Sequence, residues 1–190
     1  MRKLIIILVI ILLIIASLLI YLYSFSREDL LASSIEGVSK SINIYSPNFP
    51  PNGKIPDKYT CNGLDISPSL KWGNFTSNVK SFVIIVYDPD APKKNFIHWI
   101  IYNIPANITE LPEGIEKTEK TLFGYQGIND FGRIGWNGPC PPSGSSHRYI
   151  FRIYALDTLL NLPPGISLND LLTNMKGHVL SYGETMGIYK

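Results

Sequence analysis

Two histidines and an aspartate lie at or near the ends of apolar segments, where the side chains of neighbouring strands can meet. Asp88 ends the segment KSFVIIVYD, His98 lies near the start of FIHWIIYNI, and His147 begins HRYIFRIYAL. The turn DPDAP begins at Asp88, and its prolines fix φ, so Asp88 and His98 can meet at one edge of a sheet. Two histidines and a carboxylate match the ligand set of a non-haem iron or zinc site. Alternatively, each residue has only a local structural role, the aspartate as a turn residue and the histidines as hydrogen-bonded strand residues.

Several other kinds of active site are excluded by spacing. A serine nucleophile in a sharp strand-to-helix turn needs a glycine two residues before it and another two residues after it, and neither Ser145 nor Ser146 has both. The chain contains no G-x-x-x-x-G-K loop for a phosphate and no H-E-x-x-H motif for zinc. We therefore expect no catalytic residue and no cofactor.

The segments that must position these residues read as strands. They are rich in β-branched and aromatic residues and are separated by turn clusters with Gly and Pro. The long candidates are residues 80–88, 96–104 and 147–156, and the short ones are 42–45, 70–72 and 188–189. One helix is expected near the end of the chain, with Ser167 as its N-cap. The pattern predicts a mainly β fold, an antiparallel or mixed β-sandwich with a few short helices.

The third long candidate has two different faces. Arg148 and Arg152 alternate with His147, Tyr149 and Phe151. Because successive side chains of a strand point to opposite faces, His147 and Tyr149 share one face, and the arginines mark a more solvated one.

A long apolar run precedes these segments. Leu4 to Leu22 has no charged residue and, as a helix, would span roughly 28 Å, close to the hydrocarbon core of a bilayer. We therefore expect residues 1–26 to form an N-terminal transmembrane helix that anchors the chain. The alternative is a secretory signal peptide, because Ser24 and Ser26 are small residues of the kind found at a cleavage site.

The charges around this run predict on which side of the membrane the domain lies. Arg2 and Lys3 precede it, so the positive-inside rule keeps the amino terminus in the cytoplasm and places the domain outside the cell membrane, or in the medium after cleavage. Residues 27–41 are polar and are interpreted as a tether, and residues 42–190 as one domain. Asn74 and Asn107 begin glycosylation acceptor patterns, which are compatible with export.

The charge argues against one class of binding partner, and the cysteine content allows two states of the thiols. Without Arg2 and Lys3 the chain carries 15 basic and 15 acidic residues and has no basic tract, which argues against nucleic acid as a partner. The two cysteines, Cys61 and Cys140, are either a disulfide of an exported domain or two buried thiols. Two thiols alone do not make a structural zinc site.

Several motifs occur in an order that resembles one known family. They are YTCNG at Tyr59, SPSLKW at Ser67, YDPDAP at Tyr87, HWIIYNIP at His98, NDFG at Asn129, GPCPP at Gly138 and HRYIFRIYALD at His147. Over residues 43–189 the chain resembles the phosphatidylethanolamine-binding proteins (PEBP), which include the Raf kinase inhibitor proteins, and it is most similar to their bacterial and archaeal branch. The apolar run lies outside this pattern.

The resemblance implies a PEBP-like β-sandwich with a small anion pocket at one end, which in relatives accepts phosphate, acetate or phospholipid head groups. The pocket residues implied by the matching motifs are Asp88, Asp90, Pro92, His98, Pro141, Pro142, His147 and Tyr149. An imidazolium, a phenolic hydroxyl and free backbone N–H groups can donate together to phosphate oxygens, and Asp88 is expected to orient a histidine. Because Cys61 and Cys140 both fall in family-like motifs, the resemblance also favours a bridge between them.

Three functions follow. The first is a non-enzymatic domain, tethered outside the membrane, that binds a small anion or a phospholipid head group. The second is an inhibitor of an extracellular peptidase, or another protein-interaction module, because some members of the family inhibit peptidases or kinases. The third is a metal-dependent enzyme that uses both histidines and a carboxylate.

Overall fold

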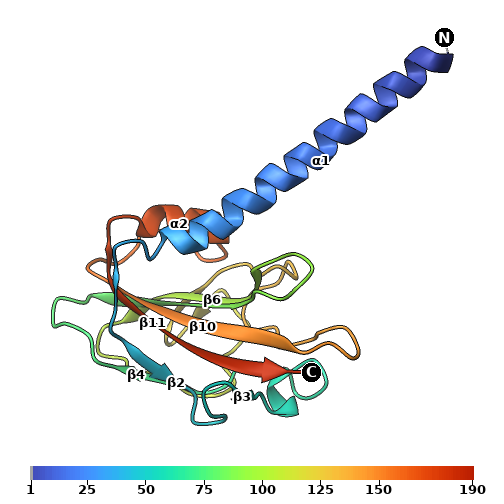
Figure 1. Ribbon diagram of the computed structural model, residues 1–190. Coiled ribbons are helices and arrows are strands. Elements are labelled where there is room, and N and C mark those ends of the chain that lie inside the picture. The colour runs from blue at the N-terminus through green and yellow to red at the C-terminus, as the bar shows by residue number, and fades with distance from the viewer. Residues whose placement is uncertain (1) are drawn as a thin grey trace.

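The computed structural model describes residues 2–190, apart from the side chains of residues 2–5, 8 and 21–29. Figure 1 shows two layers of strands, with helix α2 (Leu168–Met175) and the end of helix α1 (Arg2–Ser33) lying over one side of them. The remainder of α1 projects away from the strands.

The larger sheet has the strand order β1-β11-β10-β5-β6-β9-β8, and β3 also pairs with β11. Its long strands are β5 (Ser81–Asp88), β6 (Phe96–Pro105), β10 (His147–Leu156) and β11 (Val179–Tyr189). Its short strands are β1 (Ser39–Lys40), β3 (Gly53–Lys54), β8 (Lys120–Thr121) and β9 (Gly124–Gln126). The pairings of β1 and β3 with β11 are parallel, and the pairings among β5, β6, β8, β9, β10 and β11 are antiparallel.

The smaller sheet packs against one face of the larger one. It consists of β2 (Asn43–Tyr45), β4 (Leu70–Gly73) and β7 (Glu110–Leu111), all paired antiparallel, and a short 3-10 helix η1 (Asp57–Tyr59) lies between β3 and β4 in the sequence. The prediction of a mainly β fold is confirmed, and the three long strand candidates match β5, β6 and β10 to within one residue at each end.

The larger sheet is buried on both faces, so the protein has two cores. Phe82, Ile84 and Trp99 face the smaller sheet and belong to one apolar cluster. Val83 and Ile85, which alternate with Phe82 and Ile84 along β5, belong to a second cluster that includes the buried side of α2. This arrangement explains why the sequence of β5 is apolar throughout, as strands covered on both faces are.

Helix α2 begins where the sequence predicts. The Ser167 side chain accepts a hydrogen bond from the Asp170 backbone N–H, which satisfies one of the free donors of the first turn. Leu168, Leu171 and Met175 are buried on one side of the helix, against the larger sheet. Their spacing is that of an amphipathic helix on a core.

The expectation of a transmembrane helix over Leu4 to Leu22 has to be corrected. These residues lie in α1, but among the residues that the structure describes no helix is both long enough and apolar enough to cross a membrane. The side chains of Ser24 and Ser26, and those of Arg2 and Lys3, lie outside the description.

The end of α1 contacts the larger sheet directly. Leu31 is buried in the same cluster as α2, and its carbonyl oxygen accepts a hydrogen bond from Arg152 Nη1 at 2.8 Å. The segment interpreted as a tether, residues 27–41, thus includes the last residues of α1 and strand β1, which pairs with β11.

Candidate functional site

The strand pairing brings the ends of three neighbouring strands together at one end of the larger sheet. β5 lies between β6 and β10 and is antiparallel to both, so the last residues of β5 lie beside the first residues of its neighbours. Asp88 is opposite Phe96 at the start of β6, and Tyr87 is opposite Ile150 near the start of β10. Asp88, His98 and His147 are therefore gathered at the same edge, as their positions in the sequence predict.

His147 and Asp88 form a buried hydrogen-bonded pair. His147 Nδ1 lies 2.7 Å from Asp88 Oδ2, and Asp88 is 3% exposed. The other carboxylate oxygen, Oδ1, accepts the backbone N–H groups of Asp90 and Ala91 at 2.8 and 3.0 Å. These two backbone donors fix the carboxylate, so the His147 ring is held in one orientation with its Nε2 directed away from Asp88.

His98 is also buried, and its ring is held by a different acceptor. Its Nδ1 lies 2.6 Å from the backbone oxygen of Asn137, and its exposed fraction is 3%. Burial lowers the pKa of His98, and this effect outweighs the backbone of Asn137, the charge of Asp88 and other groups that act in the opposite direction.

Tyr149 joins the two histidines on the inner face of β10. Its ring meets the His98 ring edge-on, with 5.2 Å between centroids, and it follows His147 on the same face of the strand. Burial raises the pKa of Tyr149, with the charge of Asp88 acting in the same direction. The residue is 1% exposed, yet among the described residues its hydroxyl has no hydrogen-bond partner.

The backbone of Cys140 approaches that hydroxyl and acts to lower the pKa of Tyr149. The contact does not have the distance and angle of a full hydrogen bond. Buried hydroxyl groups in proteins are nearly always paired. The Tyr149 hydroxyl is one of the exceptions among the described residues.

Asp90 belongs to the rim of this site. Its carboxylate accepts three hydrogen bonds from Arg148, from the backbone N–H at 2.9 Å, from Nε at 2.9 Å and from Nη2 at 2.6 Å. These bonds lower the pKa of Asp90 to about 2. Asp90 is thus engaged with Arg148, and His147 acts on it through its charge, with no hydrogen bond between Asp90 and either histidine among the described residues.

The prolines expected at the pocket lie on the surface. Pro92 and Pro142 are exposed and Pro141 is half-buried. The loop that carries Pro141 and Pro142 is anchored at Gly138, where a Cβ atom would lie 2.2 Å from the backbone oxygen of Tyr59. Only glycine permits that approach.

Four residues of the site were not foreseen from the sequence. Phe96 and Phe131 meet the His98 ring edge-on, each with 5.4 Å between centroids. Asn129 Nδ2 donates to Asn137 Oδ1 at 2.8 Å. This bond stabilises Asn137, whose backbone carbonyl is hydrogen-bonded to His98. Phe96 lies two residues before His98 on the same strand. Asn129, Phe131 and Asn137 belong to the motifs NDFG and GWNG, whose turn residues are common in any loop, so the sequence offers no reason to connect these three with His98.

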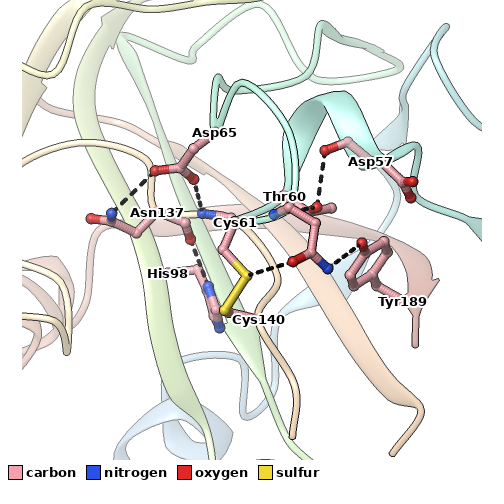
Figure 2. The surroundings of a disulfide bond; sticks show 10 residues. Asp57, Thr60, Cys61, Asp65, His98, Asn137, Cys140 and Tyr189 are labelled. Atoms are coloured by element: carbon pink, nitrogen blue, oxygen red, sulfur yellow. Dashed lines mark hydrogen bonds between the residues drawn. A yellow bond between two sulfur atoms is a disulfide. The ribbon is translucent and has the colours of Figure 1, made fainter. Parts of the chain in front are cut away.

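A disulfide links the two loops beside the site. Cys61 and Cys140 are bonded, with 5.5 Å between their Cα atoms, so of the two alternatives for the cysteines the structure contains the bridge. Figure 2 shows the surroundings of this bond, in which Asp65 is hydrogen-bonded to Asn137, and Asn137 to His98. The Asp65 carboxylate also accepts the Gly138 backbone N–H at 2.7 Å. The disulfide and Asp65 together hold the loop that faces Tyr149.

Possible metal ligands do not gather around the two histidines in the described part of the chain. Within residues 2–190, as far as they are described, no group of three or more His, Cys, Asp and Glu side chains is placed to hold a metal. The carboxylates beside the histidines are already engaged, Asp88 with His147 and Asp90 with Arg148.

Comparisons with known proteins agree on one family. The family model described as phosphatidylethanolamine-binding protein matches residues 45–190. The UPF0098 protein of Pyrococcus horikoshii is 56% identical over 146 residues, which cover 75% of this chain and 73% of that protein. The UPF0098 protein of Archaeoglobus fulgidus is 42% identical over 193 residues, which cover 100% of this chain and 65% of that protein.

Solved structures show the same similarity. A PEBP homologue from Chlamydia trachomatis superposes with a TM-score of 0.73 at 39% identity, covering 80% of this chain and 99% of that one. A protein of Escherichia coli, described as a new member of the mammalian PEBP family, superposes with a TM-score of 0.71 at 30% identity, covering 79% of this chain and 98% of that one. The chain belongs to the phosphatidylethanolamine-binding protein family.

Proposed function

We propose that this protein binds a small anion, such as a phosphate group, free or on a head group, between His98, His147 and Tyr149. The observation that carries the proposal is the Tyr149 hydroxyl, which is buried and has no partner among the described residues. An unpaired buried hydroxyl costs on the order of 1–3 kcal/mol, which an oxygen of a bound anion would recover.

The neighbouring groups support an anion as the missing partner. The Nδ1 atoms of His98 and His147 are both engaged, so each ring has its Nε2 available for a ligand. The backbone N–H of Cys140 faces Tyr149, acts to lower the pKa of that phenol, and makes no hydrogen bond with the backbone of other described residues. A backbone N–H, a phenol and a protonated imidazole donate to phosphate oxygens, and a neutral imidazole can accept from a phosphate group that carries a proton.

Asp88 has a supporting role in this proposal. Its two oxygens are occupied by His147 and by the backbone N–H groups of Asp90 and Ala91. It therefore orients His147 and is not itself a ligand of the anion. We propose binding without turnover. The two cysteines are bonded to each other, so neither is free to act as a thiolate nucleophile.

Titration calorimetry with inorganic phosphate at pH 6 tests the proposal. We expect the unmodified full chain to bind phosphate, and Tyr149→Phe and His147→Ala each to weaken binding by roughly ten- to a hundredfold, the value of a hydrogen bond to a charged group. His178→Ala is the matched control, because His178 is exposed and pairs with Asp157 away from the site. The absence of any phosphate binding by the unmodified chain at pH 6, or equal binding by Tyr149→Phe, would contradict the proposal.

A further inference from the structure

The tautomer of His98 is fixed by its surroundings. A neutral imidazole carries one N–H, and a backbone carbonyl can only accept a hydrogen bond. The 2.6 Å contact between His98 Nδ1 and the Asn137 oxygen therefore requires the proton to be on Nδ1. In the neutral ring, Nε2 then presents a lone pair to the site and is an acceptor.

The ring cannot easily turn to change this assignment. The rings of Phe96, Phe131 and Tyr149 all meet His98 edge-on within 5.4 Å between centroids. The Asn137 carbonyl is itself held, because the Asn137 backbone N–H donates to the His98 oxygen at 3.1 Å and its side chain is bonded to Asn129 and Asp65. The acceptor character of Nε2 is therefore built into the packing.

The charges around His98 do not overcome this burial. Asp88 from the end of β5 and Asp130 from the loop after β9 both favour the charged imidazole, as do the backbones of Asn137 and Gly138. Tyr149 from β10 contributes an uncharged phenol, since burial raises its pKa. Desolvation is the largest effect and lowers the pKa of His98, so the neutral ring predominates at pH 7.

An acceptor at this position discriminates between kinds of phosphate. A phosphodiester has only acceptor oxygens at pH 7, so one of them would face the Nε2 lone pair. Phosphate monoesters and inorganic phosphate have a second pKa near 6 to 7 and can carry a P–O–H group, which donates to Nε2. We propose that this site selects phosphate groups that carry a proton, inorganic phosphate and phosphate monoesters, over phosphodiesters, and that His98 Nε2 accepts that proton in the hydrogen bond. This inference rests on the proposed anion site and specifies its ligand.

Binding of a monoester should change the number of protons bound. When a monoester that is mostly a dianion at pH 7.5 binds with its proton, about one proton is taken up from solution. A phosphodiester binds only when His98 itself is protonated, which burial opposes. The affinity for the monoester should therefore exceed that for the diester, by about tenfold for each unit by which the pKa of the ligand exceeds that of His98.

The test compares phosphorylethanolamine, a monoester, with glycerophosphoethanolamine, the corresponding diester, and with inorganic phosphate. Calorimetry on the full chain at pH 7.5, in two buffers of different ionisation enthalpy, gives both the affinity and the number of protons taken up. We expect phosphorylethanolamine and phosphate to bind several-fold more tightly than the diester. The monoester should take up about one proton, and phosphate a smaller fraction, because part of it already carries its proton at pH 7.5. Equal affinities for monoester and diester, or binding of the monoester without proton uptake, would overturn the inference.

A variant separates the role of His98 from general effects of mutation. In His98→Gln the amide can offer either a donor or an acceptor, so the preference for the monoester should shrink to less than about threefold while the diester still binds. His178→Gln is the control and should keep the preference, because His178 lies on the surface with Asp157. Failure of the unmodified chain to bind any of the three ligands would refute the anion site itself, whereas binding without discrimination would refute only the selection.

Discussion

At the scale of the single residue, Tyr149 connects stability with binding. Because its buried hydroxyl has no partner among the described residues, Tyr149→Phe should leave the ligand-free protein as stable as the unmodified one or more stable by about 1 kcal/mol, although phosphate binds more weakly. Urea unfolding with and without phosphate measures both effects.

Tyr154→Phe is the matched comparison. The Tyr154 hydroxyl is bonded to Ser34 Oγ at 2.9 Å and to Arg152 Nη1 at 3.3 Å, so its removal should cost stability, about 1 kcal/mol, without changing phosphate affinity. If Tyr149→Phe destabilised the ligand-free protein more than Tyr154→Phe does, the Tyr149 hydroxyl would have a structural partner and the reasoning about an open position would fail.

His98 makes stability depend on pH in a defined direction. Burial lowers its pKa below the ordinary 6.5, so the unfolded chain binds the proton more readily than the folded one. Its stabilising contribution is complete above about pH 6.5 and is lost as the pH falls from there towards the folded pKa. The free energy of unfolding without ligand should therefore decrease between pH 7 and pH 5.

Comparison with His98→Gln isolates this contribution from that of the carboxylates. The free energy of unfolding of the unmodified chain should approach that of His98→Gln as the pH falls. The free energy of unfolding of His178→Gln should change with pH in the same way as that of the unmodified chain. A difference that stays constant between pH 7 and pH 5 would mean that His98 does not change its proton affinity on folding.

At the scale of the elements, Arg152 joins α1 to the larger sheet. Its guanidinium donates to the Leu31 carbonyl at the end of α1, to Tyr87 Oη on β5 at 2.8 Å, and to Glu184 Oε1 on β11 at 2.6 Å. A cation at the carboxyl end of a helix also interacts favourably with the helix dipole. Arg152 is 7% exposed, so these interactions are not screened by water.

Replacing this arginine should loosen α1 as well as lower stability. Arg152→Met is expected to cost about 3 kcal/mol, because it leaves Glu184 with Lys40 alone and removes the donors to Leu31 and Tyr87, and to speed amide hydrogen exchange in residues 30–38. Arg148→Met is the control, since the Arg148–Asp90 pair is exposed and should contribute less than about 1 kcal/mol. Equal losses in the two variants, or unchanged exchange in residues 30–38, would argue against this role.

At the scale of the whole molecule, the disulfide connects segments 79 residues apart. The chain-entropy model assigns a loop of this length about 4 to 5 kcal/mol, acting on the unfolded state. The Cys61→Ser, Cys140→Ser double variant should therefore unfold at a clearly lower denaturant concentration. Chemical denaturation of the oxidised protein and of the variant gives the comparison, and a loss below about 1 kcal/mol would show that the loops are held without the bond.

Local patterns were sufficient to place some elements and not others. β5, β6 and β10 were found because long runs of β-branched and aromatic residues have few alternatives to a buried strand. Arg152 was expected on a more solvated face with Arg148, but it is buried, because α1 and β11 supply a carbonyl and a carboxylate for it. A pattern along one strand cannot reveal the partners that distant segments bring.

The sequence by itself determined the identities and the chain order of Asp88, His98, His147 and Tyr149, and the antiparallel strands at whose ends they lie. The tertiary structure decided which atoms remain available for a ligand. The Asn137 carbonyl, the Asp88 carboxylate and the loop held by the disulfide come from separate parts of the chain. They fix the two imidazoles and leave the Tyr149 hydroxyl without a partner among the described residues. The physical reason is that hydrogen bonding in a buried site is satisfied by groups near in space, and their nearness exists only after the sheet and its loops have packed.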